Sequence, residues 1–354
     1  MANRIFDLQE TRGSFQVKGI VNGAAKERFY TAKKTKTNKD FRAVNFGCAY
    51  DTQKSVYLSL NGMPQKSVWF SKRNQDTGKT ETKEIPWANR SKFNEDGFRM
   101  IGVNLGLEKT YDEKTKKEVN MKKTMAPFDA CEYINANMKD DMSVFVRGNL
   151  EFSSFMDSEN NIRRSIKYIP NQVSLCQDVV YAEYNDENKP VHDFTQNIVF
   201  MGIDKESADG KDTGRFVVSA KIVTYNDIID TEFIITDSKL AGVFRKNLKA
   251  YYAITVHGKI EVSHAVQEVD EEDCWGEANS MNSVNNPTKT ELIITGATPS
   301  TLDKETYTEK NVNDAIKKVR ASKEADNKFV TKDDNANEDD WGTSDSSDDE
   351  DTPW

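Results

Sequence analysis

The sequence lacks long apolar runs, closely spaced cysteines and an apolar segment at its start. No apolar run is longer than about five residues, which excludes a membrane-spanning helix of about 20 residues. The cysteines form no CxxC pair, which excludes a zinc ribbon and argues against a disulfide scaffold; they are Cys48, Cys131, Cys176 and Cys274. The opening MANRIFDLQE has no apolar stretch typical of a secretory signal. We therefore expect a cytoplasmic protein, in the host cytoplasm if the chain is viral.

Motifs of catalysis are also scarce. The three histidines, His192, His257 and His264, have no partner at zinc-finger or HExxH spacing, and GxxxxGK[ST], GxGxxG and GxSxG are absent. A magnesium site for a nuclease could be built from Asp140 and Asp141 or from the run at 271–273, but such runs are usually solvated loops. A metal site could also be imagined at His257, His264 and Cys274, but His257 occupies the repeat position of Arg147, so it is expected to be an ordinary strand residue. The sequence predicts no enzyme, no metal site and no cofactor.

Charge is distributed unevenly along the 354 residues. The chain has 49 Lys and Arg against 58 Asp and Glu, a net charge of −9. Residues 1–180 carry about +8 and residues 181–332 about −7, and the last segment, 333–354, has about ten acids and no base. The overall acidity therefore does not exclude a polyanionic partner for the first half.

Short β-branched and aromatic runs recur between turn-forming residues, as in antiparallel sheets, and only three segments predict helices: 127–138, 237–248 and 309–325. A weak repeat relates VRGNLEFS at 146–153 to VHGKIEVS at 256–263. The element order is three strands, a helix, a strand with a central glycine, and a last strand, which is the order of the five-stranded OB barrel. We predict a mainly β protein with two OB-like barrels and few short helices. Another two-lobed antiparallel fold is the alternative.

The two copies differ in length, and this difference suggests a domain division. About 65 more residues separate Phe41 from Val146 than separate the matching Phe216 and Val256. We predict a basic OB-like domain at 1–180 with a basic, aromatic insert at about 61–125, and a second OB-like domain at 191–300. A short helix and linker at 301–332 and a disordered acidic tail at 333–354 would follow.

Aromatic residues alternate with cations in several segments of the basic half. Single-stranded nucleic acid requires this combination, because its bases stack on rings while cations contact its phosphates. Strand aromatics are core residues more often than not, but the clusters together favour binding through one open channel. The predicted nucleic-acid-binding residues are Tyr30, Lys33, Lys34, Lys36, Phe41, Arg42, Trp69, Phe70, Lys72, Arg73, Trp87, Arg90, Lys92, Arg147, Arg163, Arg164, Lys167 and Tyr168.

The acidic tail ends in an aromatic residue. Such a segment cannot bury a core, but a terminal ring beside carboxylates suits docking into an apolar pocket with a basic rim. The predicted partner-docking residues are Asp348, Asp349, Glu350, Asp351, Pro353 and Trp354. A solubilising tail with an incidental tryptophan is the alternative.

This ending resembles that of the single-stranded-DNA-binding proteins of bacteria and their phages, which join an OB barrel to an acidic, flexible C-terminus. Bacterial members end in acidic residues, Pro and Phe, whereas this chain has Trp354 as its last residue and Thr352 before Pro353. The resemblance implies that the tail recruits replication, recombination and repair proteins. Two barrels and an insert are more similar to a phage or mobile-element version, so oligomeric state does not carry over.

We therefore expect a sequence-nonspecific single-stranded DNA-binding protein whose tail also competes with DNA. One alternative is a structural or scaffold protein of a virion. Another is a nuclease or strand-annealing enzyme. RNA in place of DNA stays open, because no motif senses a 2′-hydroxyl.

Overall fold

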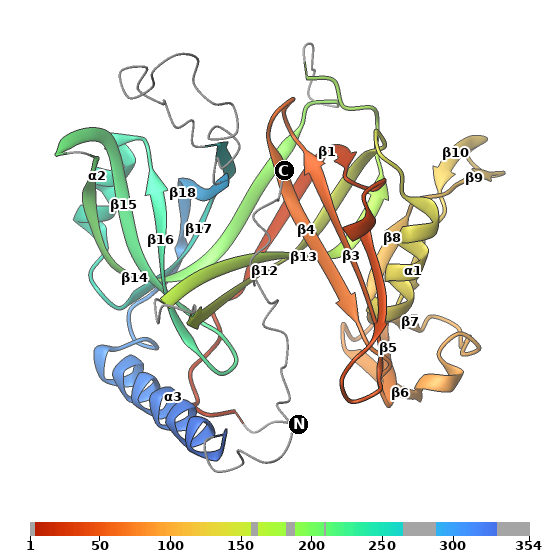
Figure 1. The fold of residues 1–354 in the computed structure, drawn as a ribbon, viewed down its shortest axis with the longest axis horizontal. Coiled ribbons are helices and arrows are strands. Elements are labelled where there is room, and N and C mark those ends of the chain that lie inside the picture. Colours follow the sequence, from red (N-terminus) through yellow and green to blue (C-terminus); the bar gives the residue numbers. More distant parts are fainter. Residues whose placement is uncertain (1–3, 157–161, 182–187, 209, 265–287, 331–354) are drawn as a thin grey trace, which may run out of the picture.

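The computed structural model describes residues 4–156, 162–181, 188–208, 210–264 and 288–330. The fold is mainly β, with two barrel-shaped lobes joined through long central strands (Figure 1). The predicted acidic tail lies outside the described residues. None of the described helices is both long and apolar enough to cross a membrane.

The first lobe is a closed barrel of five strands, which we call barrel 1. Its strands are β1 (Gly13–Asn22), β3 (Asp40–Ala49), β4 (Ser55–Gly62), β12 (Ser143–Met156) and β13 (Ile162–Leu175). The ring runs β1–β3–β4–β13–β12 and back to β1, and only the β4–β13 pair is parallel. Helix α1 (Pro127–Asn137), with Pro in its first turn, lies between β4 and β12 in the chain and directly precedes β12. This is the strand order and helix position of an OB barrel.

The second lobe, barrel 2, repeats this arrangement. Its strands are β14 (Val191–Ala208), β15 (Lys211–Val223), β16 (Ile228–Ile235), β17 (Tyr252–His264) and β18 (Thr288–Asp303). They close in the order β14–β15–β16–β18–β17, again with one parallel pair, β16–β18. Helix α2 (Ser238–Asn247) follows β16, and the Asp237 side chain caps it by accepting from Lys239 N. The prediction of two OB-like barrels is confirmed.

The repeated glycine has the same role in both barrels. The ladder between β12 and β13 shifts register at Gly148, and the ladder between β17 and β18 shifts at Gly258. A Cβ atom would lie 2.0 Å from Ile169 O at the first glycine and 1.8 Å from Ile293 O at the second. Both bends therefore need a residue without a side chain, because the neighbouring backbone occupies that space.

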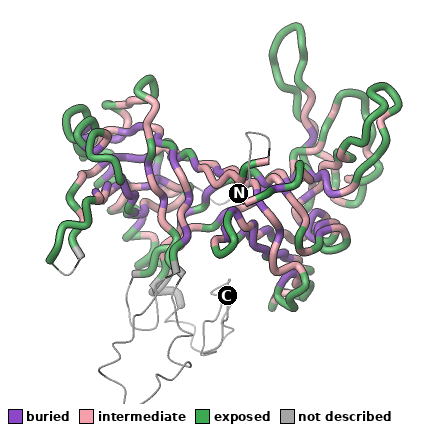
Figure 2. The backbone as a smooth tube through the Cα atoms, turned by 90° about the horizontal axis from the view of Figure 1, so that it is seen from above, coloured by how far each residue is buried: buried purple, intermediate pink, exposed green. Residues whose placement is uncertain are grey.

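The barrels are joined edge to edge by β1 and β14, which pair antiparallel. Phe15 of β1 lies opposite Phe194 of β14. On the other side of its strand, Phe15 pairs with Gly148 of β12, and Phe194 pairs in the same way with Gly258 of β17. An approximate twofold axis therefore passes through the phenylalanine pair. One hydrophobic core continues through both barrels, and buried backbone runs through both lobes in Figure 2.

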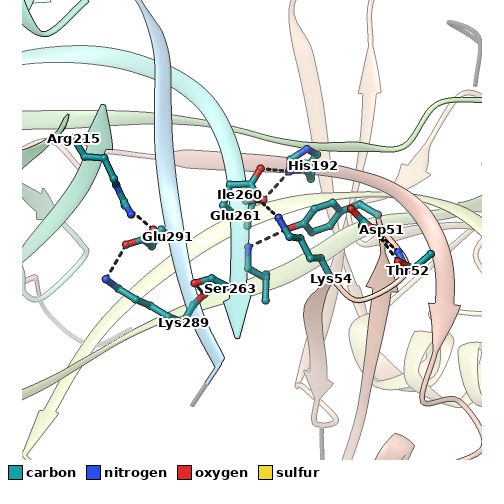
Figure 3. A network of polar contacts seen from close by, with 12 residues as sticks. Asp51, Thr52, Lys54, His192, Arg215, Ile260, Glu261, Ser263, Lys289 and Glu291 are labelled. Atoms are coloured by element: carbon teal, nitrogen blue, oxygen red, sulfur yellow. Dashed lines mark hydrogen bonds and ion pairs between the residues drawn. The ribbon is translucent and has the colours of Figure 1, made fainter. Parts of the chain in front are cut away.

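Polar contacts also cross the junction (Figure 3). Lys54 Nζ, in the turn between β3 and β4, lies 3.2 Å from Glu261 Oε2 of β17. The Tyr50 hydroxyl accepts a hydrogen bond from Val262 N at 2.9 Å, and the Tyr50 ring stacks on His192 with centroids 4.2 Å apart. Barrel 2 therefore holds the β3–β4 turn of barrel 1 in place.

A long insert separates β4 from α1. It contains β5 (Ser67–Arg73), β6 (Thr80–Pro86), β7 (Arg99–Met100), β8 (Val103–Gly106), β9 (Lys109–Asp112), β10 (Lys117–Asn120) and β11 (Lys123–Met125). Strands β5, β6 and β7 form a sheet with its own small core around Val68 and Phe70, and β8 joins the end of β13.

Three described elements lie outside the two barrels and the insert. Strand β2 (Tyr30–Lys34) forms a hairpin with β3, after a short 3-10 turn (Glu27–Phe29). Helix α3 (Glu309–Val330) packs its apolar side against the N-terminal segment, where Phe6 and Leu8 share a core with Val312 and Val319.

Candidate nucleic-acid interface

A groove of about 860 Å³ lies on the outer face of β3 and β4 in barrel 1. One side is the loop between β1 and β2, another is β13, and the β3–β4 turn closes one end. The strand face and loops concerned are those that OB barrels use for oligonucleotides. The lining residues are Asn22, Gly23, Lys26, Arg28, Phe29, Asn45, Phe46, Gly47, Thr52, Gln53, Ser55, Tyr57, Leu58, Ser59, Ile166, Lys167 and Tyr168.

Strand alternation produces the floor of the groove. Along β4, Val56, Leu58 and Leu60 point into the core, which leaves Tyr57 on the outer face between two serines. The Tyr57 side chain is 46% exposed. Partial burial raises the pKa of Tyr57 above its ordinary value. The ordinary value of about 10 already keeps a phenol neutral at physiological pH, so this ring carries no charge that would repel phosphate.

A glycine faces this tyrosine on β3. Gly47 pairs with Tyr57, and a Cβ atom at Gly47 would lie 1.7 Å from Asn22 Oδ1. The Asn22 side chain occupies that space and donates a hydrogen bond to Ser55 Oγ at 2.8 Å. The floor of the groove next to the exposed Tyr57 ring therefore consists of a glycine and small polar side chains.

The charge of the groove is of one sign. Of the described residues that line it, three are cations, Lys26, Arg28 and Lys167, and none is acidic. Lys26 and Arg28 come from the loop, while Lys167 comes from β13 on the other side. An exposed ring between cations on two walls can stack a base while its flanking phosphates meet positive charge.

Most sequence-predicted residues do not line this groove. Only Lys167 and Tyr168 of that set do. Tyr168 is only 5% exposed and packs its ring edge to face on Phe15, so its prediction as a base-stacking residue is wrong. The groove is therefore not the single channel of rings and cations that the sequence predicts.

Several of the other predicted rings and cations belong to the insert and form packing contacts or ion pairs. Phe70, predicted to stack on a base, is 6% exposed and packs on Phe93, so it belongs to the core of the insert. Arg90 forms two hydrogen bonds with Asp129 of α1, at 2.6 and 2.8 Å, and its guanidinium lies 4.0 Å from the Trp87 ring centroid. This bidentate contact holds the insert on the barrel and gives Trp87 and Arg90 a structural role. Their contact with nucleic acid stays a prediction.

Arg42 and Lys72 also form contacts with other residues of the chain. The Arg42 guanidinium lies 4.0 Å from the Phe128 ring centroid and 2.9 Å from Glu132 Oε2. Lys72 Nζ donates to Asp96 O at 2.9 Å. These cations stabilise packing around α1 and the insert.

The remaining predicted residues belong to three parts of the chain and do not line the groove. Lys33, Lys34, Lys36 and Phe41 lie on the β2–β3 hairpin, where Lys33 sits over the Phe41 ring at 5.9 Å, and Tyr30 packs against the core. The exposed residues Trp69, Arg73 and Lys92 belong to the insert, and Arg147, Arg163 and Arg164 to the β12–β13 hairpin.

Sequence reasoning missed Tyr57, Lys26 and Arg28. The signal for Tyr57 was present in the run Val56-Tyr57-Leu58, where an aromatic residue occupies the outward position between two inward aliphatic residues. The sequence does not show that Tyr57 lies near Lys167, because the two residues are about 110 positions apart and only the fold brings them into one groove.

Barrel 2 has different residues at the equivalent positions. The matching registers put Glu232 at the place of Tyr57, Asp230 at the place of Ser55 and Glu291 at the place of Lys167. The carboxylate of Glu291 lies 2.7 Å from Arg215 and 2.8 Å from Lys289 (Figure 3). The face of barrel 2 thus has three carboxylates where barrel 1 has a ring, a hydroxyl and a cation.

Among the described residues, no group of three or more His, Cys, Asp or Glu is placed to hold a metal ion. The side chains of His264 and Cys274 lie outside the described residues.

Known proteins were compared with this chain by sequence and structure. No curated protein sequence matches it. Two structures of the single-stranded DNA binding protein from Thermus aquaticus are similar to it, a deletion variant at 8% identity and TM-score 0.38 and the wild type at 9% and 0.37. These matches cover 82% of this chain and 94% and 93% of the other chains. The family model named YorF matches residues 72–335, and the chain belongs to the YorF family.

Proposed function

We propose that barrel 1 binds single-stranded DNA in the groove over β3 and β4, without sequence preference. The observation that carries this proposal is the composition of the groove: one exposed ring, Tyr57, between cations on two walls, with no acidic residue among the described lining. Stacking accepts any base because every base has a π face, and cations contact any phosphate. Low specificity follows from both contacts.

The groove suits an unpaired strand better than a duplex. It is concave, and Tyr57 lies on its floor, where only a base that is splayed out of a helix reaches the ring. Duplex recognition requires an element that enters a groove of the DNA, such as a helix or a β-ribbon that carries base contacts. The polar floor around Asn22 and Ser55 also offers hydrogen-bonding groups to base edges or sugars.

Barrel 2 does not take the same ligand at its equivalent face. Glu232, Asp230 and Glu291 supply neither a stacking ring nor a cation at the positions of Tyr57, Ser55 and Lys167. Asp230 and Glu291 are held in ion pairs with Lys221 and with Arg215 and Lys289, and Glu232 adds an exposed carboxylate that would repel phosphate. Barrel 2 instead supports the groove, because it binds the turn that carries Lys54, next to the lining residues Gln53 and Ser55.

The cellular role that fits this activity is coating of single strands in DNA replication, recombination or repair. The protein acts as a binding protein and not as an enzyme, and its acidic tail docks partner proteins through Pro353, Trp354 and the acids before them. A flexible chain of 22 residues would span about 25 Å, which is enough to fold back over a small domain. The ten acids at 333–354 would then compete with DNA for the cations of barrel 1.

The direct test is Tyr57→Ala, with Tyr225→Ala as the matched control. Both side chains are 46% exposed, but Tyr225 belongs to barrel 2 and does not line the groove. Fluorescence anisotropy with labelled oligo-dT should show about 5- to 150-fold weaker binding for Tyr57→Ala, as expected for about 1–3 kcal/mol of stacking per base. The control should bind like the wild type.

Three results would contradict the proposal or part of it. No binding of oligo-dT by the wild type at low salt would leave the scaffold function as the better reading. Magnesium-dependent degradation of the oligonucleotide would indicate a nuclease. Equal low-salt affinities of the full chain and of a chain truncated after Lys332 would remove competition by the tail, which is expected to lower affinity only at low salt.

A further inference from the structure

A second charged recess lies where barrel 1, barrel 2 and α3 meet. It has a volume of about 310 Å³ and is distinct from the groove. The β12–β13 hairpin of barrel 1 contributes Ser154 and Arg164, and the other lining residues come from barrel 2 and α3: Lys221, Asp227, Ile228, Ile229, Asp230, Ile316, Val319, Arg320 and Lys323.

Hydrogen bonds and ion pairs tie the three elements together around the recess. Asp227 Oδ2 lies 2.8 Å from Lys323 Nζ of α3 and 3.4 Å from Ser154 Oγ of the hairpin. Lys221 pairs with Asp230 at 2.5 Å across the β15–β16 ladder. The recess is therefore a built site, in which each carboxylate already has a lysine partner.

Two arginines in the recess have no such partner. Within the described part of the chain, Arg164 and Arg320 form no ion pair with another residue. Four cations against two carboxylates leave the recess with a net positive charge, and the two arginines provide it. A guanidinium binds phosphate through two parallel hydrogen bonds, which makes arginine well suited to a polynucleotide backbone.

The hairpin connects this recess with the groove. Lys167 lines the groove and Arg164 lines the recess, and both lie on β13. Three residues of β-strand span about 10 Å, and the odd spacing directs the two side chains to opposite faces of the strand. A strand that leaves the groove past Lys167 therefore reaches Arg164 by crossing the β12–β13 ribbon.

We propose that the recess is a second backbone site for the same single strand, in which Arg164 and Arg320 bind phosphates beyond the part held in the groove. This inference rests on the proposed function of the groove. It assigns to α3 and to one edge of barrel 2 a direct role in binding DNA, although the face of barrel 2 equivalent to the groove is acidic.

The test is a length series of oligo-dT, from about 4 to well beyond about 16 nucleotides, the range of site sizes for one OB barrel. The full-length double variant Arg164→Glu with Arg320→Glu is compared with Lys318→Glu, an exposed cation of α3 that does not line the recess. A second double variant, with glutamine at both arginines, removes the charges without reversing them, and thermal unfolding checks that each variant is folded.

The expected result depends on length. The double variants should bind the shortest oligonucleotides like the Lys318→Glu control and the longest ones about tenfold or more weakly. The salt slope for long oligonucleotides should fall by about 1.4, because each lost phosphate contact removes about 0.7.

Other results would overturn the inference. Equal loss at all lengths would mean a general charge effect, and no loss at any length would mean that the strand does not reach the recess. A gain in affinity at all lengths would mean that the recess holds an acidic polypeptide segment. Failure of the proposed function itself looks different, because the wild type would then bind no oligonucleotide of any length.

Discussion

The two barrels have the same internal design and opposite outer faces. Both close through the same ring of strands, and both have a glycine at the same bulge, Gly148 in barrel 1 and Gly258 in barrel 2. On the outer face, Tyr57 and Lys167 of barrel 1 correspond to Glu232 and Glu291 of barrel 2. Barrel closure therefore constrains the inward residues and the bulge, while the outward residues are free to define different functions.

The largest expected effect comes from placing the barrel 2 residue in barrel 1. Tyr57→Glu removes the stacking ring and adds a carboxylate to the groove, so oligo-dT affinity should fall by more than about 100-fold at low salt. Fluorescence anisotropy measures this loss. The reciprocal change, Glu232→Tyr, should leave affinity unchanged, because Asp230 and Glu291 still make that face acidic. Similar losses in both variants would mean that the barrels share the ligand.

The next largest effect is expected from substitution of the bulge glycine that both barrels share. Gly148→Ala and Gly258→Ala each force a methyl group against a backbone carbonyl of the neighbouring strand, so each should lower the free energy of unfolding by about 1–3 kcal/mol. Thermal unfolding measures the loss. Gly242→Ala is the control, because nothing lies within 4 Å of a Cβ atom there and alanine favours the α2 helix. If only one bulge variant is destabilised, the two bends are not equivalent.

The fold could be predicted largely from the sequence, because a closed barrel requires a recognisable order of strands, a helix and a strand glycine in neighbouring residues. The helix predicted at 237–248 is α2, and the repeated segments at 146–153 and 256–263 lie on β12 and β17. The short strands β6 to β11 of the insert were not predicted, because their residues are mostly polar and they gain their order from pairing and from the small core around Phe70.

The groove could not be predicted in the same way. Rings and cations that are neighbours in the sequence, such as Trp87 and Arg90, also stabilise a folded domain through cation–π contacts, so this pattern does not separate binding from packing. The groove joins Arg28, Tyr57 and Lys167 from three distant segments. Only the register of the closed barrel brings them together.

The smallest expected effect is the loss of stability on substitution of Glu291, the barrel 2 residue that corresponds to Lys167 of barrel 1. Burial of Glu291 opposes its ionisation, but hydrogen bonds from Lys289 and Arg215 outweigh this cost and lower its pKa. A lowered carboxyl pKa stabilises the fold above the ordinary value of about 4.3, and this contribution is lost as the pH falls through the lower folded value. Glu291→Gln should therefore reduce stability at neutral pH, by on the order of 1 kcal/mol or less.

Because protonated glutamate resembles glutamine, the stability difference between the wild type and Glu291→Gln should shrink as the pH falls below about 4. Chemical denaturation at several pH values measures it, and oligo-dT affinity at neutral pH should not change. Lys167→Gln should do the reverse, with weaker binding, a salt slope smaller by about 0.7 and an unchanged pH profile of stability. If Glu291→Gln weakens DNA binding as much as Lys167→Gln does, the acidic face of barrel 2 contributes to the DNA site and the division of roles between the barrels is wrong.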